Sequence, residues 1–317
     1  MGVMDTELET PQLVLGTMDY GTRVDQETSF AILDRFVEAG GRWLDTANCY
    51  SFWNDPAGLG GASERVLGAW LSAAPGVRDA VAIATKVRHD PLVAHAWPES
   101  AEGLSAAAIE RGLTLSLERL GTDHVDLLWA HAEDRTVELA ETVAAFGAEV
   151  ARGRAARVGA ANHAAWRVER ARSLAAQQSV EGYSALQLRH SLVRPRPDTP
   201  IPEAGHRLLT DDDLDFARSE RLAVWCYTPL LHGAYVRSDR PFDPAYDHPG
   251  TTRTLRVLAD ISRELDATPN QIVLAWLLAQ GLSPIVGASR VEHLDDALGA
   301  RDVTLTEEHL QRFVEAR

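Results

Sequence analysis

Lysine is almost absent from this sequence. The 317-residue chain has 31 basic residues, and every one of them except Lys86 is an arginine. The 46 acidic residues outnumber them and give a formal net charge of −15, which argues against a nucleic-acid-binding protein, because such proteins present a basic surface. The chain has no apolar run of about 18 residues and no basic-then-apolar start, so we expect neither a membrane span nor a signal peptide.

Cysteine is scarce as well. The two cysteines, Cys49 and Cys226, lie far apart and lack the spacing of metal ligands. Such sparse cysteine is typical of a reducing compartment, so we expect a cytoplasmic protein without a metal centre. Hydrophobic residues make up 45% of the chain and charged residues 24%, which is ordinary for a soluble globular protein.

The lone lysine stands at the end of an apolar, strand-like segment, residues 82–86. Burial lowers the pKa of a lysine from its usual value of about 10.4, whereas arginine stays charged at any working pH. Lys86 is therefore a candidate for proton chemistry or for Schiff-base formation. The alternative is a structural lysine whose amine reaches solvent from the strand end.

Short apolar segments alternate with segments of helical periodicity along the chain. The predicted strands are 13–17, 43–47, 81–87, 125–131, 157–162, 184–188, 222–227 and 283–287. The predicted helices lie at about 26–39, 65–71, 105–120, 136–152, 166–176, twice within 254–280, at 291–298 and from 306 onward. Eight such units predict a single-domain (β/α)₈ TIM barrel spanning residues 1–317.

An open, doubly wound sheet is the alternative fold. Its phosphate-binding signature, Gly-x-Gly-x-x-Gly after the first strand, is missing, because Gly16 and Gly21 do not have that spacing. The segments 189–209 and 231–253, which follow the sixth and seventh strands, are too long for simple connections. Long loops in this position are often functional, so we expect a lid or clamp from either one.

Three ionisable residues stand at strand ends: Asp45 on the second strand, Lys86 on the third and His131 on the fourth. Tyr50 follows Asp45 in the same loop. In a barrel these strand ends meet at one rim, where neighbouring strands are about 4.8 Å apart. Together the four groups could protonate a carbonyl oxygen: we expect the ammonium to lower the pKa of the phenol, the carboxylate to hold the ammonium, and the imidazole to orient the substrate.

Asp45, Tyr50, Lys86 and His131 resemble the catalytic tetrad of the aldo-keto reductases. Four further segments resemble recurrent segments of that family in the expected order, and they are 15–18, 43–47, 157–162 and 285–290. The resemblance runs from about residue 13 to residue 298. It implies a barrel that binds NADPH without a Rossmann domain and reduces the carbonyl of an aldehyde or ketone, with Tyr50 as general acid.

The resemblance also assigns cofactor contacts. Asn162 and Gln187 would hold the nicotinamide carboxamide, and Tyr227 would stack on its ring. Gly287, Ser289 and Arg290 fall where the family binds the 2′-phosphate, and a helix N-terminus with a hydroxyl and an arginine is a good anion site. The remaining positions carried over are Thr17, Met18, Pro229, Leu230 and Asp296. Ser289 is also a candidate N-cap for the helix that follows.

Three positions depart from the family's pattern: Ala161 stands where serine is usual, Ala297 where asparagine is usual, and Val286 where proline is common. The first two remove cofactor contacts. The substrate pocket is expected to be apolar, with aromatic and thioether walls from Met18, Tyr20, Phe52, Trp53 and Trp129.

Three neighbours of the tetrad have interpretations of their own. We expect Arg88 and His89 to be solvated rim residues rather than substrate contacts, and Cys49 to be a site of inhibitory oxidation. Two other functions compete with carbonyl reduction: a Schiff-base lyase that uses Lys86, and a non-catalytic, NADPH-binding regulatory subunit of a membrane channel. Natural substrate, reaction direction and oligomeric state do not follow from the sequence.

Overall fold

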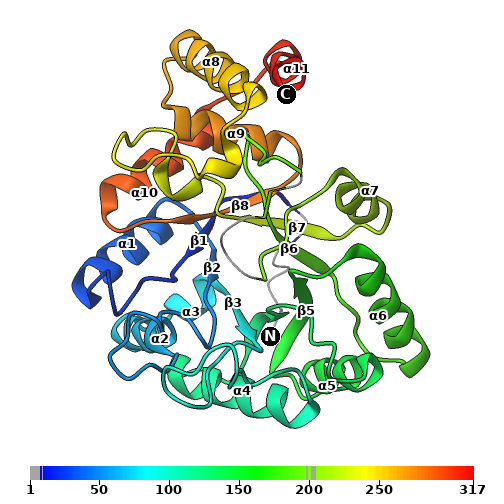
Figure 1. Cartoon of the computed structure of the whole chain (residues 1–317). Helices are drawn as coiled ribbons and strands as arrows, with labels where there is room; N and C mark the ends of the chain where they lie inside the picture. Colours follow the sequence, from blue (N-terminus) through cyan, green and yellow to red (C-terminus); the bar gives the residue numbers. More distant parts are fainter. Residues whose placement is uncertain (1–7, 9, 198, 201–204) are drawn as a thin grey trace.

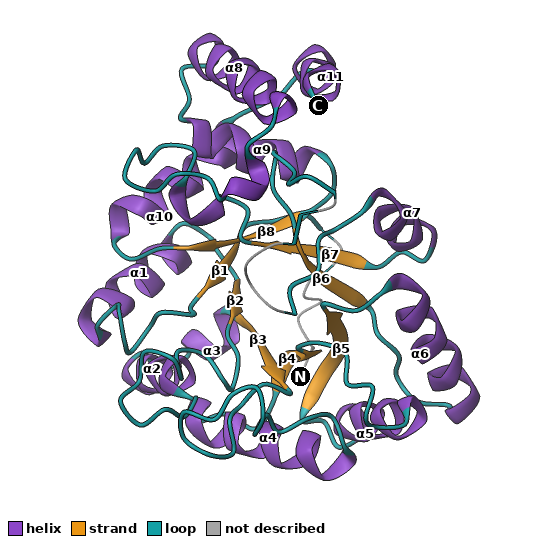
Figure 2. Cartoon of the chain, in the orientation of Figure 1, coloured by secondary structure: helices purple, strands orange, loops and turns teal. Residues whose placement is uncertain are grey.

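Eight parallel strands close into a barrel in the computed structural model, which describes residues 8, 10–197, 199–200 and 205–317. Each strand pairs with the next one in the chain, and β1 pairs with β8. Helices surround the strands (Figures 1 and 2). The predicted (β/α)₈ barrel is therefore confirmed, and the open sheet is excluded because its edge strands would remain unpaired.

The strands lie within two residues of the predicted bounds. They are β1 (Val14–Gly16), β2 (Trp43–Asp45), β3 (Ala82–Val87), β4 (Val125–Ala130), β5 (Ala155–Ala161), β6 (Ala185–Arg189), β7 (Ala223–Tyr227) and β8 (Ser283–Gly287). The differences arise at strand ends, where ladder hydrogen bonds give way to turns.

The α-helices are α1 (Gln26–Glu38), α2 (Ala62–Ala73), α3 (Val77–Ala80), α4 (Ala106–Leu120), α5 (Leu139–Ala151), α6 (Ala165–Gln178), α7 (Asp211–Ser219), α8 (Pro249–Glu264), α9 (Pro269–Ala279), α10 (Val291–Leu298) and α11 (Glu307–Ala316). Short 3₁₀ turns are η1 (Leu231–Gly233), η2 (Pro244–Tyr246) and η3 (Gly299–Asp302). Helix α7 was not predicted, although Thr210 and Asp213 form a reciprocal capping box at its start.

The start of α2 differs from the prediction. The helix begins at Ala62 after Gly61, whose φ of 93° suits glycine, so Ser63 lies inside the first turn and does not cap it. The Ser63 hydroxyl instead donates to the carbonyl of Thr17 and contacts the hydroxyl of Thr46 at 2.8 Å. Ser63 therefore ties α2 to the ends of β1 and β2, next to the expected site.

Two apolar layers build the core. The outward-facing strand residues pack against the helices, and a second cluster fills the barrel interior around Trp43, Trp129 and Trp225. The ring centroids of Trp225 lie 5.1 Å from Trp43 and 5.3 Å from Trp129, in edge-to-face contacts. Gly159 makes this possible, because a Cβ there would meet the Trp129 ring at 2.5 Å. The interior is filled, so any site must lie at the barrel rim.

The two long loops after β6 and β7 are bonded to each other. The Ser191 hydroxyl lies 2.7 Å from the hydroxyl of Tyr235, which also accepts from the amide of Val193 at 3.1 Å. The amide of Arg196 donates to the carbonyl of Ala245. The described parts of these loops therefore form one joined structure at the carboxyl-terminal rim. Within the described ranges, no helix combines the length and the apolar character needed to cross a bilayer.

Candidate active site

Lys86 points into the barrel from the carboxyl end of β3, where its side chain is fully buried. The amine donates to Oδ2 of Asp45 at 2.5 Å, to the carbonyl of Thr46 at 2.8 Å and to Oη of Tyr50 at 2.7 Å. An ammonium has three N–H groups, so this set uses all of them. The lysine is therefore held inside the protein and does not extend to solvent.

Burial and pairing act against each other on Asp45 and Lys86. Removal from water lowers the pKa of Lys86 and raises that of Asp45, because it disfavours both charged forms, while the contact between them opposes each shift. Gln187 adds a third group, since its amide donates to Oδ1 of Asp45 at 3.0 Å. Both carboxylate oxygens thus have a donor, as a buried ion pair requires.

Tyr50 lies half-buried in the β2–α2 loop, and its hydroxyl oxygen accepts the hydrogen bond from the Lys86 amine. Its pKa is raised well above the usual value, first by burial and next by the charge of Asp45. The expected lowering of the Tyr50 pKa is therefore wrong, because desolvation of the phenolate and the nearby carboxylate of Asp45 raise it. Tyr50 consequently carries its proton at neutral pH, and that proton is not shared with Lys86, which donates to the phenol oxygen.

His131 follows β4 and completes the group. Its ring centroid lies 5.9 Å from that of Tyr50 and 4.5 Å from that of His89. Burial holds the pKa of His131 well below its ordinary range, with smaller contributions from His89 and from the charge of Lys86, so the imidazole is neutral. The structure thus brings together the four residues predicted from sequence, at one end of the barrel.

The expectation of solvated rim residues is wrong for both Arg88 and His89. Arg88 donates from Nε to the carbonyl of Glu133 at 2.9 Å, and its φ of 125° is unusual for a residue with a side chain. His89 is half-buried against His131, and burial lowers its pKa to about 3. The loop after β3 turns back over the barrel end, which the sequence did not indicate.

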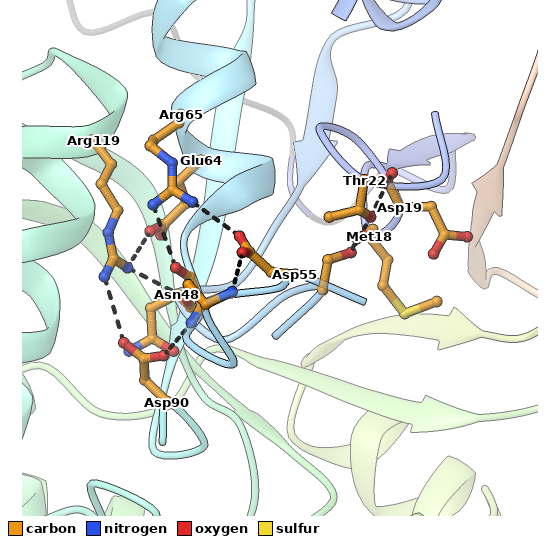
Figure 3. Close-up of polar contacts among 12 residues, drawn as sticks. Met18, Asp19, Thr22, Asn48, Asp55, Glu64, Arg65, Asp90 and Arg119 are labelled. Atoms are coloured by element: carbon orange, nitrogen blue, oxygen red, sulfur yellow. Dashed lines mark hydrogen bonds and ion pairs between the residues drawn. The ribbon is translucent and has the colours of Figure 1, made fainter. Parts of the chain in front are cut away.

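A buried ionic network supports the loop that carries Tyr50. Figure 3 shows Arg119 of α4 pointing toward Glu64, Asp90 and Asn48. Its guanidinium donates to Oε2 of Glu64 at 3.1 Å and to the Asn48 carbonyl at 3.2 Å, and it reaches Asp90 at 3.5 Å. Asn48 also donates from its side chain to Glu102 at 2.5 Å. These contacts fix the backbone two residues before Tyr50.

The expected nicotinamide contacts form a chain beside the tetrad. Nδ2 of Asn162 donates to the His131 carbonyl at 3.1 Å, and Oδ1 of Asn162 accepts from the Tyr227 hydroxyl at 2.6 Å. Gln187 is buried on the opposite side, bonded to Asp45. Asn162 directly follows β5, Gln187 lies in the carboxyl-terminal half of β6 and Tyr227 ends β7, so all three lie toward the same end of the barrel as Lys86.

The remaining predicted contacts after β1 and β7 differ in accessibility. The Thr17 side chain is fully buried and donates to the Asp45 carbonyl at 3.1 Å, so it serves the packing of β1 against β2. Met18 is exposed, and its carbonyl accepts from Ser51 at 2.5 Å. Pro229 is buried with its carbonyl bonded to Ser191, while Leu230 is half-buried.

Gly287, Ser289 and Arg290 are exposed between β8 and α10. The N-cap of α10 is Arg290, without a side-chain cap, so the interpretation of Ser289 as the N-cap is wrong. The Ser289 hydroxyl instead lies 3.2 Å from Nδ1 of His293. The Arg290 side chain is 65% exposed, and its acidic neighbour is distant, with Oε2 of Glu292 3.9 Å from Nε of Arg290. The guanidinium is therefore accessible to an anion.

Two further cationic or polar groups stand near this segment and were missed. His293 lies one turn into α10, and Arg237 of the β7–α8 loop is close enough to lower the pKa of His293, although burial and Arg290 contribute more. Asp296 is directed elsewhere: its carboxylate accepts from Thr268 at 2.7 Å and from Asn270 at 3.0 Å. It therefore joins α10 to the start of α9.

The expected aromatic wall is only partly present. Trp129 and Tyr20 are buried, Trp129 inside the barrel and Tyr20 in the outer core, so neither lines the rim. Phe52 and Trp53 follow Tyr50 in the same loop, with ring centroids 5.0 Å apart, and Trp53 is 47% exposed. Trp97 joins them, 5.9 Å from Phe52. Trp129 stands one residue before the end of β4 and points into the filled interior, and sequence position alone did not distinguish it from a rim residue.

Comparison with known proteins agrees with this arrangement. The sequence model described as "Aldo/keto reductase family" matches residues 12–317. The uncharacterized oxidoreductase YrpG of Bacillus subtilis (strain 168) is 30% identical, over 96% of this chain and 92% of its own length. The 6-dehydroglucose reductase of Agrobacterium fabrum is 29% identical over 95% and 92%, and the aldo-keto reductase yakc [NADP(+)] of Schizosaccharomyces pombe is 28% identical over 92% and 83%. This chain belongs to the aldo/keto reductase family.

Proposed function

We propose that the protein is an NADPH-dependent reductase that converts the carbonyl of a small aldehyde or ketone into an alcohol. The observation that carries the proposal is the contact of the Lys86 amine with both Asp45 and Tyr50, next to the His131 ring. A proton donor, a buried cation and a neutral imidazole at one barrel rim are the groups that carbonyl protonation requires.

The residues of the chain have distinct parts in this reaction. NADPH, when bound, supplies the hydride for the carbonyl carbon. His131 donates a hydrogen bond to the carbonyl oxygen and orients it. Tyr50 gives its Oη proton to that oxygen, and the ammonium of Lys86, 2.7 Å away, stabilises the phenolate that remains. Asp45 keeps the ammonium in place, and solvent returns the proton to Tyr50.

The residues present fit the cofactor. Accessible Ser289 and Arg290 at the amino end of α10 suit the 2′-phosphate, and Asn162 and Tyr227 suit the nicotinamide end. The name of the yeast relative, which includes NADP(+), supports the choice of NADPH. Both cysteines are free thiols, which is in keeping with the expected cytoplasmic location.

The lyase alternative is weaker. A Schiff-base lysine attacks as a free amine, whereas all three N–H groups of Lys86 have acceptors and Asp45 stabilises its charge. The regulatory-subunit alternative keeps the cofactor site but predicts little or no turnover.

Two measurements separate these functions. Steady-state NADPH consumption with a panel of aromatic and aliphatic aldehydes should show turnover that saturates with aldehyde. Borohydride added with substrate should leave no covalent adduct on Lys86. An adduct would indicate the lyase, and tight NADPH binding without consumption of any aldehyde would indicate the regulatory subunit.

A further inference from the structure

Three metal-binding side chains that are distant in sequence converge beside the tetrad. Cys49 precedes Tyr50, His89 lies in the loop after β3, and His131 follows β4. One ligand atom of each lies within 4.8 Å of the others. Of these residues only His131 has a part in the proposed reaction, so Cys49 and His89 need another explanation.

The distances are close to those of a tetrahedral site. Zinc binds sulfur at about 2.3 Å and nitrogen at about 2.0–2.1 Å, which places two ligand atoms roughly 3.5 Å apart. The Cys49 Sγ lies 3.7 Å from Nδ1 of His131. The His89 and His131 rings are half-buried, and their planes are tilted by 38° to each other. Small rotations about their side-chain torsions can therefore bring a His89 ring nitrogen to the same metal ion.

The three groups are uncharged before a metal ion binds. Burial raises the pKa of the Cys49 thiol, the charge of Asp90 adds to this and Lys86 opposes it, so the thiol carries its proton at neutral pH. Among the described residues, no hydrogen bond occupies the His89 ring nitrogens, and both imidazoles are neutral, as metal ligation requires.

We propose that Cys49, His89 and His131 bind one thiophilic divalent metal ion, with Zn²⁺ as the first candidate, and that this ion inhibits carbonyl reduction. Cys49 loses its thiol proton to solvent as the sulfur–metal bond forms, and the two histidines each give one nitrogen lone pair. Three protein ligands leave a fourth position for water. Inhibition follows because His131, once bound to the ion, cannot orient the carbonyl oxygen of the substrate. This second part rests on the proposed function.

The binding test uses Co²⁺ as a spectroscopic substitute for zinc, added to the full-length protein. We expect one equivalent to produce thiolate-to-cobalt charge-transfer absorption and the visible bands of a tetrahedral site. Cys49→Ala should abolish the charge-transfer absorption, and His89→Ala should raise the Kd at least tenfold. Cys226→Ala is the matched control, because Cys226 is buried on β7 outside the cluster, and it should bind cobalt as the parent does. Absence of the charge-transfer absorption, or its persistence in Cys49→Ala, would overturn the site.

The inhibition test compares NADPH consumption with and without Zn²⁺, each variant relative to its own metal-free rate. We expect zinc to reduce the parent rate at least tenfold, chelation by EDTA to restore it, and Cys49→Ala to lose this sensitivity. Cobalt binding at Cys49 without zinc inhibition would overturn the inhibitory role. If the metal-free protein consumes no NADPH but binds cobalt through Cys49, the proposed reductase function fails while the metal site stands.

Discussion

The Tyr227 hydroxyl donates a 2.6 Å hydrogen bond to Oδ1 of Asn162, so the residue expected to stack on a nicotinamide ring contacts one expected to hold its carboxamide. The same oxygen accepts from the amide of Arg207 at 3.1 Å. Asn162 itself has a φ of 55°, a left-handed conformation that asparagine tolerates better than most residues. The Asn162 side chain is thus fixed by contacts within the protein.

Because a bound carboxamide would compete with Tyr227 for Asn162, Tyr227→Phe should bind NADPH as well as the parent or up to about fivefold more tightly. It keeps the stacking ring and removes a hydrogen bond worth about 1 kcal/mol. Tyr227→Ala loses the ring and should bind more weakly. Titration of tryptophan fluorescence, with Trp225 two residues away on β7, measures both constants. Equal weakening in the two variants would show that the hydroxyl assists binding.

Tyr50→Phe should lower kcat by about 10²–10⁴-fold, the usual contribution of a general acid. The Kd for NADPH should change little, because the hydroxyl acts mainly in the transition state. Single-turnover NADPH consumption gives the rate of the chemical step, and fluorescence titration gives the Kd. Near-normal rates in the Phe variant would assign the proton to another donor.

The tetrad was predictable from the sequence because barrel topology brings strand ends together whatever their separation in the chain. Asp45, Lys86 and His131 each follow an apolar strand, and a parallel barrel leaves them one rim to share. The single lysine among 31 basic residues also indicated that β3 carries part of the site. Helix α7 was missed because its acidic first turn conceals the short apolar face, which includes Leu214 and Ala217.

What the sequence did not reveal depends on how loops fold back. His89 was assigned to solvent because nothing in its neighbours shows that the chain turns there, yet it packs on His131. The direction of the Tyr50 pKa was also wrong, since the sequence shows which charges are near but not how completely water is excluded. Arg237 was missed because the sequence does not show that the β7–α8 loop comes near enough to α10 to affect the pKa of His293.

Arg290→Ala should weaken NADPH binding at least tenfold and leave NADH binding almost unchanged. The two nucleotides differ by the 2′-phosphate, and the accessible guanidinium at the start of α10 is the group proposed to read it. Arg301→Ala is a suitable control, because that arginine donates to the carbonyl of Ala39 and is not a proposed phosphate contact. Equal losses for NADPH and NADH would remove Arg290 from the phosphate site.

Glu102 links the loop that carries Tyr50 to the loop that follows β3, the strand of Lys86. Its Oε1 accepts from the Asn48 side chain at 2.5 Å and from the amide of Arg88 at 2.6 Å. Burial raises its pKa from 4.5 to about 7, against the lowering effect of both hydrogen bonds. The folded protein therefore holds this proton more tightly than the unfolded chain does, so Glu102 costs stability progressively as the pH rises from about 4.5 to 7 and the full cost persists above.

Glu102→Gln should remove that cost, because an amide oxygen accepts the same two hydrogen bonds without a charge. The free energy of unfolding of the variant minus that of the parent should rise between pH 5 and pH 8, toward a limit of about 3 kcal/mol set by the pKa shift. Urea denaturation at both pH values measures it. Glu99→Gln, an equal charge change at an exposed position of the same segment, should show no such rise. A difference for Glu102→Gln that is the same at pH 5 and pH 8 would mean that the carboxyl group stays ionised across this range, so that its two hydrogen bonds outweigh its burial.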